Sequence, residues 1–171
     1  MRVVFLVFMV LSFLVGGGSA GLLKVNIDKR TEGLDYAAVE KAKQQIEDLK
    51  KQGIDVEKIE DADVQQSLEM IKKAPEKWQA DTAGILGMVV ALCSLVMVVF
   101  AFMKKDLVNK LAIVVVALSA ALWFIAPDIE ATMTSGASPK AIAMVSLVAL
   151  IICSACAFMS YKTYLKKSVA A

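Results

Sequence analysis

The chain has 171 residues, 58% of them apolar, and a mean hydropathy of +0.64. A soluble domain is usually about 45–50% apolar, so this composition predicts a membrane protein. The formal net charge is +2, and the placement of the basic residues argues against a DNA-binding protein, whose basic residues would cluster on one soluble face. Histidine is absent, which removes the commonest metal ligand and general base. All three cysteines fall inside apolar runs, so no disulfide framework is predicted.

The first stretch, MRVVFLVFMVLSFLVGGGSAG, predicts a signal peptide over residues 1–20. One positive charge precedes an apolar core of thirteen residues (3–15), and small residues follow. Gly18 and Ala20 fit the small-x-small pattern of a cleavage point after Ala20. The core is shorter than the roughly 20 residues that a membrane span needs. The alternative is an uncleaved anchor, and both interpretations place the next segment outside the cytoplasm.

Residues 21–82 contain fourteen acidic and eleven basic residues and predict an extracytoplasmic α-helical hairpin. Apolar residues recur at heptad spacing in two stretches. They are Val39, Ala42, Ile46 and Leu49 in the first stretch and Val64, Leu68 and Ile71 in the second. A hairpin this short seldom builds its own core, so we expect it to pack on copies of itself or on another subunit. The alternative is a solvated, partly disordered stalk.

Three apolar runs, at about 83–103, 107–126 and 141–161, predict a three-helix transmembrane region over residues 83–161. Each run is near the length that a bilayer requires, and none has a charge in its middle. Two lysine groups flank these runs. They are Lys104, Lys105 and Lys110 in the first connection and Lys162, Lys166 and Lys167 in the tail, residues 162–171. The positive-inside rule places both groups in the cytoplasm, so the fold class is an all-α membrane protein with a basic cytoplasmic tail.

Small residues form stripes on the predicted spans. The stripes consist of Ala83, Gly87 and Ala91 in the first span and Ala149, Cys153 and Ala157 in the third. Small faces let helices approach closely, and packing of this kind holds helices together in lipid. The stripes therefore predict either the interior of a three-helix bundle or a face for a partner helix or for self-association.

The stretch CSAC contains Cys153 and Cys156 and is the one candidate for redox chemistry. A redox pair needs accessible thiols of lowered pKa, whereas these lie within an apolar run, so we expect them to be packing residues. The spans carry no charged group of the kind that marks a transport pathway. Their serines, Ser94, Ser119, Ser146 and Ser154, are expected to bond to carbonyls of their own helices. The sequence thus predicts no enzyme activity, cofactor, metal, nucleic-acid partner or small-molecule substrate.

The leading hypothesis is a non-enzymatic structural or accessory subunit of a cell-envelope membrane complex, in a bacterial inner membrane. Its partners would be the lipid bilayer and other membrane subunits, or further copies of the chain. Residues 81–130 also resemble conjugative (type IV secretion) pilins in layout. Those proteins have a cleaved leader and two apolar helices joined by a short basic cytoplasmic loop, here KKDLVNK. That resemblance covers about fifty residues and implies an assembling secretion component. A holin-like pore former is a further alternative.

Overall fold

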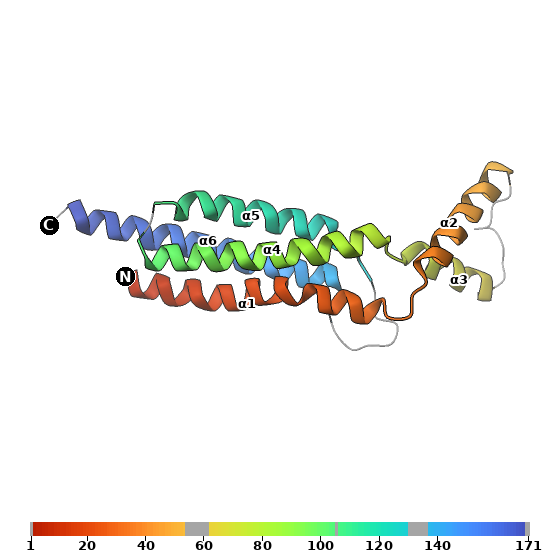
Figure 1. Cartoon of the computed structure of the whole chain (residues 1–171), viewed down its shortest axis with the longest axis horizontal. Helices are drawn as coiled ribbons and strands as arrows, with labels where there is room; N and C mark the ends of the chain where they lie inside the picture. The colour runs from red at the N-terminus through yellow and green to blue at the C-terminus, as the bar shows by residue number, and fades with distance from the viewer. Residues whose placement is uncertain (1, 54–61, 105, 130–136, 170–171) are drawn as a thin grey trace.

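The computed structural model describes residues 2–53, 62–104, 106–129 and 137–169. Within these ranges all regular secondary structure is helical, which confirms the predicted all-α class (Figure 1). The helices are α1 (Arg2–Arg30), α2 (Tyr36–Lys51), α3 (Ala62–Lys73), α4 (Lys77–Phe102), α5 (Val108–Ile125) and α6 (Pro139–Val169).

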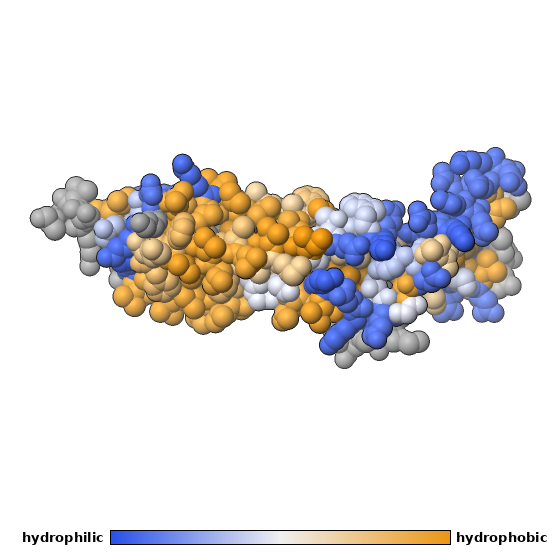
Figure 2. All heavy atoms as spheres, in the orientation of Figure 1, coloured by the Kyte–Doolittle hydropathy of each residue, from blue (hydrophilic) through white to orange (hydrophobic). Residues whose placement is uncertain are grey.

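In the described part of the chain four helices, α1, α4, α5 and α6, are long and apolar enough to cross a membrane. Figure 2 shows the apolar surface that they form and the polar surface of the end that carries α2 and α3. The three predicted spans fall within α4, α5 and α6. The fourth, α1, covers the residues predicted as a signal peptide and continues without a break to Arg30. Neither the signal peptide nor the count of three spans is therefore confirmed.

The length of α1 follows from its distribution of charge. Residues 3–23, between Arg2 and Lys24, carry no charge. These twenty-one residues are about 31 Å long as a helix, which matches the hydrocarbon thickness of a bilayer. The apolar core predicted from the sequence, residues 3–15, is shorter because the small residues that begin at Gly16 mark its end. In the structure Gly16, Gly17 and Ala20 are buried against other helices and continue the span.

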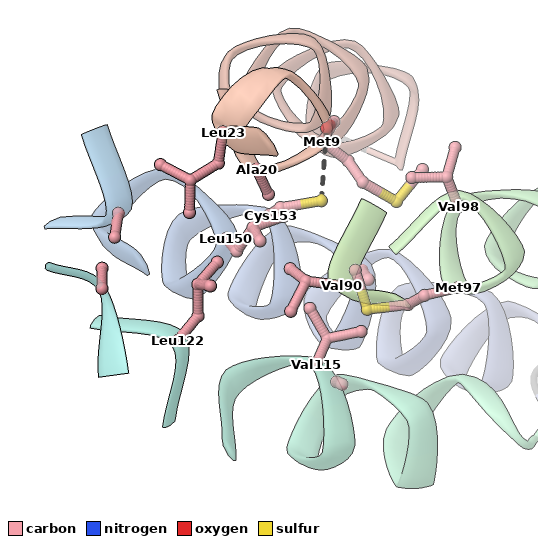
Figure 3. Close-up of a cluster of buried hydrophobic side chains, with 14 of the residues drawn as sticks. Met9, Ala20, Leu23, Val90, Met97, Val98, Val115, Leu122, Leu150 and Cys153 are labelled. Atoms are coloured by element: carbon pink, nitrogen blue, oxygen red, sulfur yellow. Dashed lines mark hydrogen bonds between the residues drawn. The ribbon is translucent and has the colours of Figure 1, made fainter. Parts of the chain in front are cut away.

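The four apolar helices form a bundle in which α1 packs on α4 and α6, and α5 packs on the same two helices. Each helix contributes fully buried side chains to the centre, shown in Figure 3. These include Met9 and Leu23 of α1, Val90 and Met97 of α4, Val115 and Leu122 of α5, and Leu150 and Cys153 of α6. The first helix is thus part of the same core as the three predicted spans.

Helices α2 and α3 lie at the end of the bundle opposite both chain termini (Figure 1). The Asp35 carboxylate caps α2 by accepting hydrogen bonds from the backbone nitrogens of Ala37 and Ala38, at 3.0 and 3.1 Å. Beyond the other end of α2, Gly53 has a φ of +80°, a left-handed conformation that suits glycine after a helix. The lysine Nζ of Lys43 donates to the Ala74 carbonyl at 2.8 Å and ties α2 to the segment that follows α3.

Candidate functional site

The small-residue stripes of the predicted spans lie inside the bundle. Buried members are Ala83, Gly87, Ala149, Cys153 and Ala157, and Ala91 is half-buried. Helix α1 covers much of this surface. A Cβ atom added at Gly87 would overlap the Ala20 carbonyl oxygen of α1. In this arrangement the stripes hold α1 within the same chain, and they could accept a partner helix only if α1 were absent.

Among the described residues, two hydrogen bonds join α1 to α6. The Ser146 hydroxyl donates to the Gly16 carbonyl at 2.8 Å, and the Cys153 thiol donates to the Met9 carbonyl at 3.4 Å (Figure 3). Gly16 permits the close approach, because an added Cβ would lie 2.8 Å from the Leu150 side chain. Polar bonds between helices supplement packing in an apolar medium, so α1 and α6 are joined by both.

The buried serines behave in two ways. Ser94 and Ser119 donate to the carbonyls of Ala91 and Val115 in their own helices, as predicted. Ser146 reaches α1, and the hydroxyl of Ser154 lies 3.5 Å from the Ala112 carbonyl of α5. The prediction was wrong for these two because sequence spacing cannot reveal a carbonyl on a neighbouring helix.

The three cysteines lie on bundle helices and differ in burial. All three are free thiols, with Cys153 buried and Cys93 and Cys156 half-buried. The Cys153 thiol donates its hydrogen bond to the Met9 carbonyl. No cluster of three or more cysteine, aspartate or glutamate side chains that could hold a metal is found among the residues described.

The apolar residues of the predicted hairpin gather in one groove between α2 and α3. Its volume is about 380 Å³. Six of the seven predicted seam residues line it, namely Ala42, Ile46, Leu49, Val64, Leu68 and Ile71. Of these only Leu68 is buried, and α2 contributes no buried residue at all. The seams thus face one another without closing into a core.

A second cleft of about 470 Å³ lies where α2 meets the start of α4. Val39, the remaining seam residue, lines it together with Tyr36, Pro75 and Trp78. The Trp78 side chain is 56% exposed, and its indole nitrogen donates to the Glu76 carboxylate. An exposed tryptophan beside an apolar groove extends the surface that the hairpin offers.

The opposite end of the bundle is strongly basic. The start of α1, the connection between α4 and α5 and the end of α6 meet there (Figure 1). These segments carry seven basic residues and one acid, Asp106, against twelve basic and sixteen acidic residues in the rest of the chain. The predicted lysines Lys104, Lys110 and Lys162 are exposed at this end. Lys105 and the side chains of Lys166 and Lys167 lie outside the described residues.

Two of these cations share one aromatic ring. The guanidinium of Arg2 lies 5.4 Å from the centroid of the Tyr164 ring, and the ammonium of Lys104 lies 4.8 Å from it. Lys104 has a φ of +58°, at the position after α4 where glycine is usual. That conformation costs a non-glycine residue about 1–2 kcal/mol. The sequence indicates a topological role for Lys104 but no contact with Arg2, because nothing in it places α1 beside α4.

No protein-family model matches this chain, and no curated protein or solved structure is significantly similar to it. A role cannot therefore be carried over from a relative. Two features of the described structure bear on function: the open hairpin groove at one end of the bundle and the basic cluster at the other.

Proposed function

We propose that this chain is a structural or accessory subunit of a membrane protein complex in a bacterial inner membrane, and that it binds its partner through the α2–α3 groove. The hairpin lies in the periplasm, and the basic end of the bundle lies in the cytoplasm. The charge distribution supports this orientation, because short cytoplasmic segments carry an excess of lysine and arginine.

In this proposal α1 is retained as a fourth span. The support is its packing, since Met9 and Ala20 of α1 have no exposed surface, and removal of residues 1–20 would uncover the faces of α4 and α6 that they contact. The alternative is the predicted signal peptide, cleaved after Ala20, with three spans in the mature chain. Both arrangements give the same orientation. The intact mass of the protein purified from its membrane distinguishes them, because cleavage removes twenty residues.

The observation that carries the proposed function is the contrast between the two halves of the molecule. The bundle has a closed core, whereas the hairpin exposes both of its apolar seams to one groove. An apolar groove between two helices is a common binding site for an amphipathic partner helix. Each Å² of apolar surface that a partner removes from water stabilises the complex by about 25 cal/mol, so a partner that covers this groove binds favourably.

Photocrosslinking in native membranes tests this proposal. A photoreactive amino acid replaces Ile46, which lines the groove, and in a matched control it replaces Lys41, which is exposed on the same helix and lines neither hairpin cleft. We expect one specific adduct from position 46 and none from position 41. Equal labelling at both positions would refute binding through the groove. A monomer without co-purifying protein in native electrophoresis would refute the subunit role itself.

A further inference from the structure

The basic end of the bundle carries a second feature, separate from the hairpin groove, in the cluster of Arg2, Lys104 and Tyr164. We infer that this cluster binds the phosphate group of an anionic phospholipid. The inference rests on the proposed retention and orientation of α1, because Arg2 belongs to that helix.

The cluster has an excess of positive charge that the protein does not neutralise. Among the described residues, neither Arg2 nor Lys104 forms an ion pair. Arg2 uses one guanidinium nitrogen, Nη2, in a 3.4 Å hydrogen bond to the Ala101 carbonyl, while its buried Nε has no hydrogen-bond partner in that part of the chain. Both cations lie within 6 Å of the centroid of one ring, and an anion bound beside them would offset their positive charge.

The donors suit a phosphate. Guanidinium N–H groups donate charge-assisted hydrogen bonds to phosphate oxygens, and ammonium acts as a compact point charge. The Tyr164 hydroxyl is a further donor on the same ring. Lys104 follows α4 in a left-handed conformation that glycine would adopt without steric strain, and its ammonium lies over the Tyr164 ring.

The surroundings favour a lipid over a soluble phosphate. Arg2 is followed directly by the apolar run of α1, and Lys104 follows the last turn of α4. Large apolar side chains next to both cations are exposed, with Val3 at 70%, Phe102 at 51% and Met103 at 56%. Basic pockets between membrane helices on the cytoplasmic side bind anionic headgroups. Acyl chains would lie along these side chains while the headgroup contacts the cations.

Native mass spectrometry of the full-length protein in detergent tests the inference by titration with dioleoyl phosphatidylglycerol or dioleoyl phosphatidylcholine. We expect tighter binding of phosphatidylglycerol, and a loss of about fivefold in its affinity for Arg2→Gln and for Lys104→Gly. Lys104→Gly also relieves the left-handed strain, so misfolding would not explain its loss. The control, Lys162→Gln, removes a charge from the same end, but that ammonium lies over Phe158. We expect less than a twofold change for it.

Three results would overturn the inference. The first is equal affinity for the two lipids, and the second is an equal loss in Lys162→Gln, which would indicate unspecific attraction to the whole basic end. The third is inorganic phosphate that binds with the same sensitivity to Lys104→Gly while phosphatidylglycerol does not bind. The same spectra report the chain mass. A chain without residues 1–20 would overturn the retention of α1 together with this site, whereas an intact chain without lipid preference would overturn the site alone.

Discussion

The contact between α1 and α4 at Gly87 offers the sharpest test of the four-helix bundle. A Cβ atom at position 87 would overlap the Ala20 carbonyl oxygen by about 1 Å relative to the closest C···O approach of about 3.3 Å. The oxygen belongs to the backbone, so it cannot turn away as a flexible side chain would. The substitution Gly87→Ala therefore forces the two helices apart by about 1 Å over this turn. A gap of that size forfeits a quarter to a half of the local dispersion energy.

Overpacking of this kind costs about 1–3 kcal/mol. Alanine also has a higher intrinsic helix propensity than glycine, by about 1 kcal/mol, which offsets part of the cost. The matched control is Gly18→Ala, because a Cβ atom there meets nothing within 4 Å and the gain in propensity is the same. The difference between the two variants isolates the clash, and we expect Gly87→Ala to be the less stable by about 2 kcal/mol.

Thermal unfolding in a mild detergent, followed by near-ultraviolet circular dichroism, measures this difference. For a chain of this length 2 kcal/mol corresponds to a Tm lower by about 4–8 °C. Equal melting of the two variants would refute the close contact between α1 and α4. In a chain cleaved after Ala20 both the clashing carbonyl and residue 18 would be gone, so Gly87→Ala would then melt no lower than the Gly18→Ala control.

Three further predictions follow from single contacts. Ser146→Ala should lower the free energy of unfolding by about 0.6 kcal/mol, an average value for interhelical hydrogen bonds in membranes. The control Ser119→Ala should lower it less, because that bond lies within α5. An equal effect of the two substitutions would contradict the bond from Ser146 to Gly16. Asp35→Ala removes the cap of α2 and should cost about 1 kcal/mol, seen as faster hydrogen exchange in α2 with the bundle unchanged; protection of α2 equal to that of the unsubstituted protein would refute the cap. Cys153 should react with N-ethylmaleimide only after denaturation because its side chain has no exposed surface, and labelling in the folded protein would show that α1 does not cover it.

The sequence predicted the three later apolar helices well because their charges mark their ends. Lys104 and Lys110 border one connection, and Asp128 and Lys140 border the other. The first helix is harder to predict from the sequence, since the stretch GGGSAG is compatible with two structural roles. Small residues form a peptidase site when the chain is extended and accessible, and they form a helix contact when another helix lies against them. The positions of α4 and α6 distinguish a cleavage site from a helix contact, and the spacing of residues within α1 does not reveal those positions.

The two candidate sites also differ in how far the sequence predicts them. The hairpin groove could be anticipated, because the heptad spacing on each stretch specifies which residues share a face, and six of those seven residues line one groove. The basic cluster could not be anticipated, since Arg2 of α1, Lys104 after α4 and Tyr164 of α6 are far apart in the chain. The sequence indicated a common membrane side for the lysines but not that two cations would meet on one ring.

The retention of α1 also determines which surfaces of the chain remain for a partner. With α1 in place the stripe at Gly87 and Cys153 is covered, and the proposed partner would bind at the hairpin groove. With α1 removed, that stripe would become an open membrane face of small residues, which suits close packing against the same face of another copy. A pilin-like assembly requires that second state, because its leader is cleaved. Intact mass and the stability of Gly87→Ala therefore discriminate between a resident subunit and an assembling one before any partner is known: a full-length chain destabilised by the substitution excludes the open stripe.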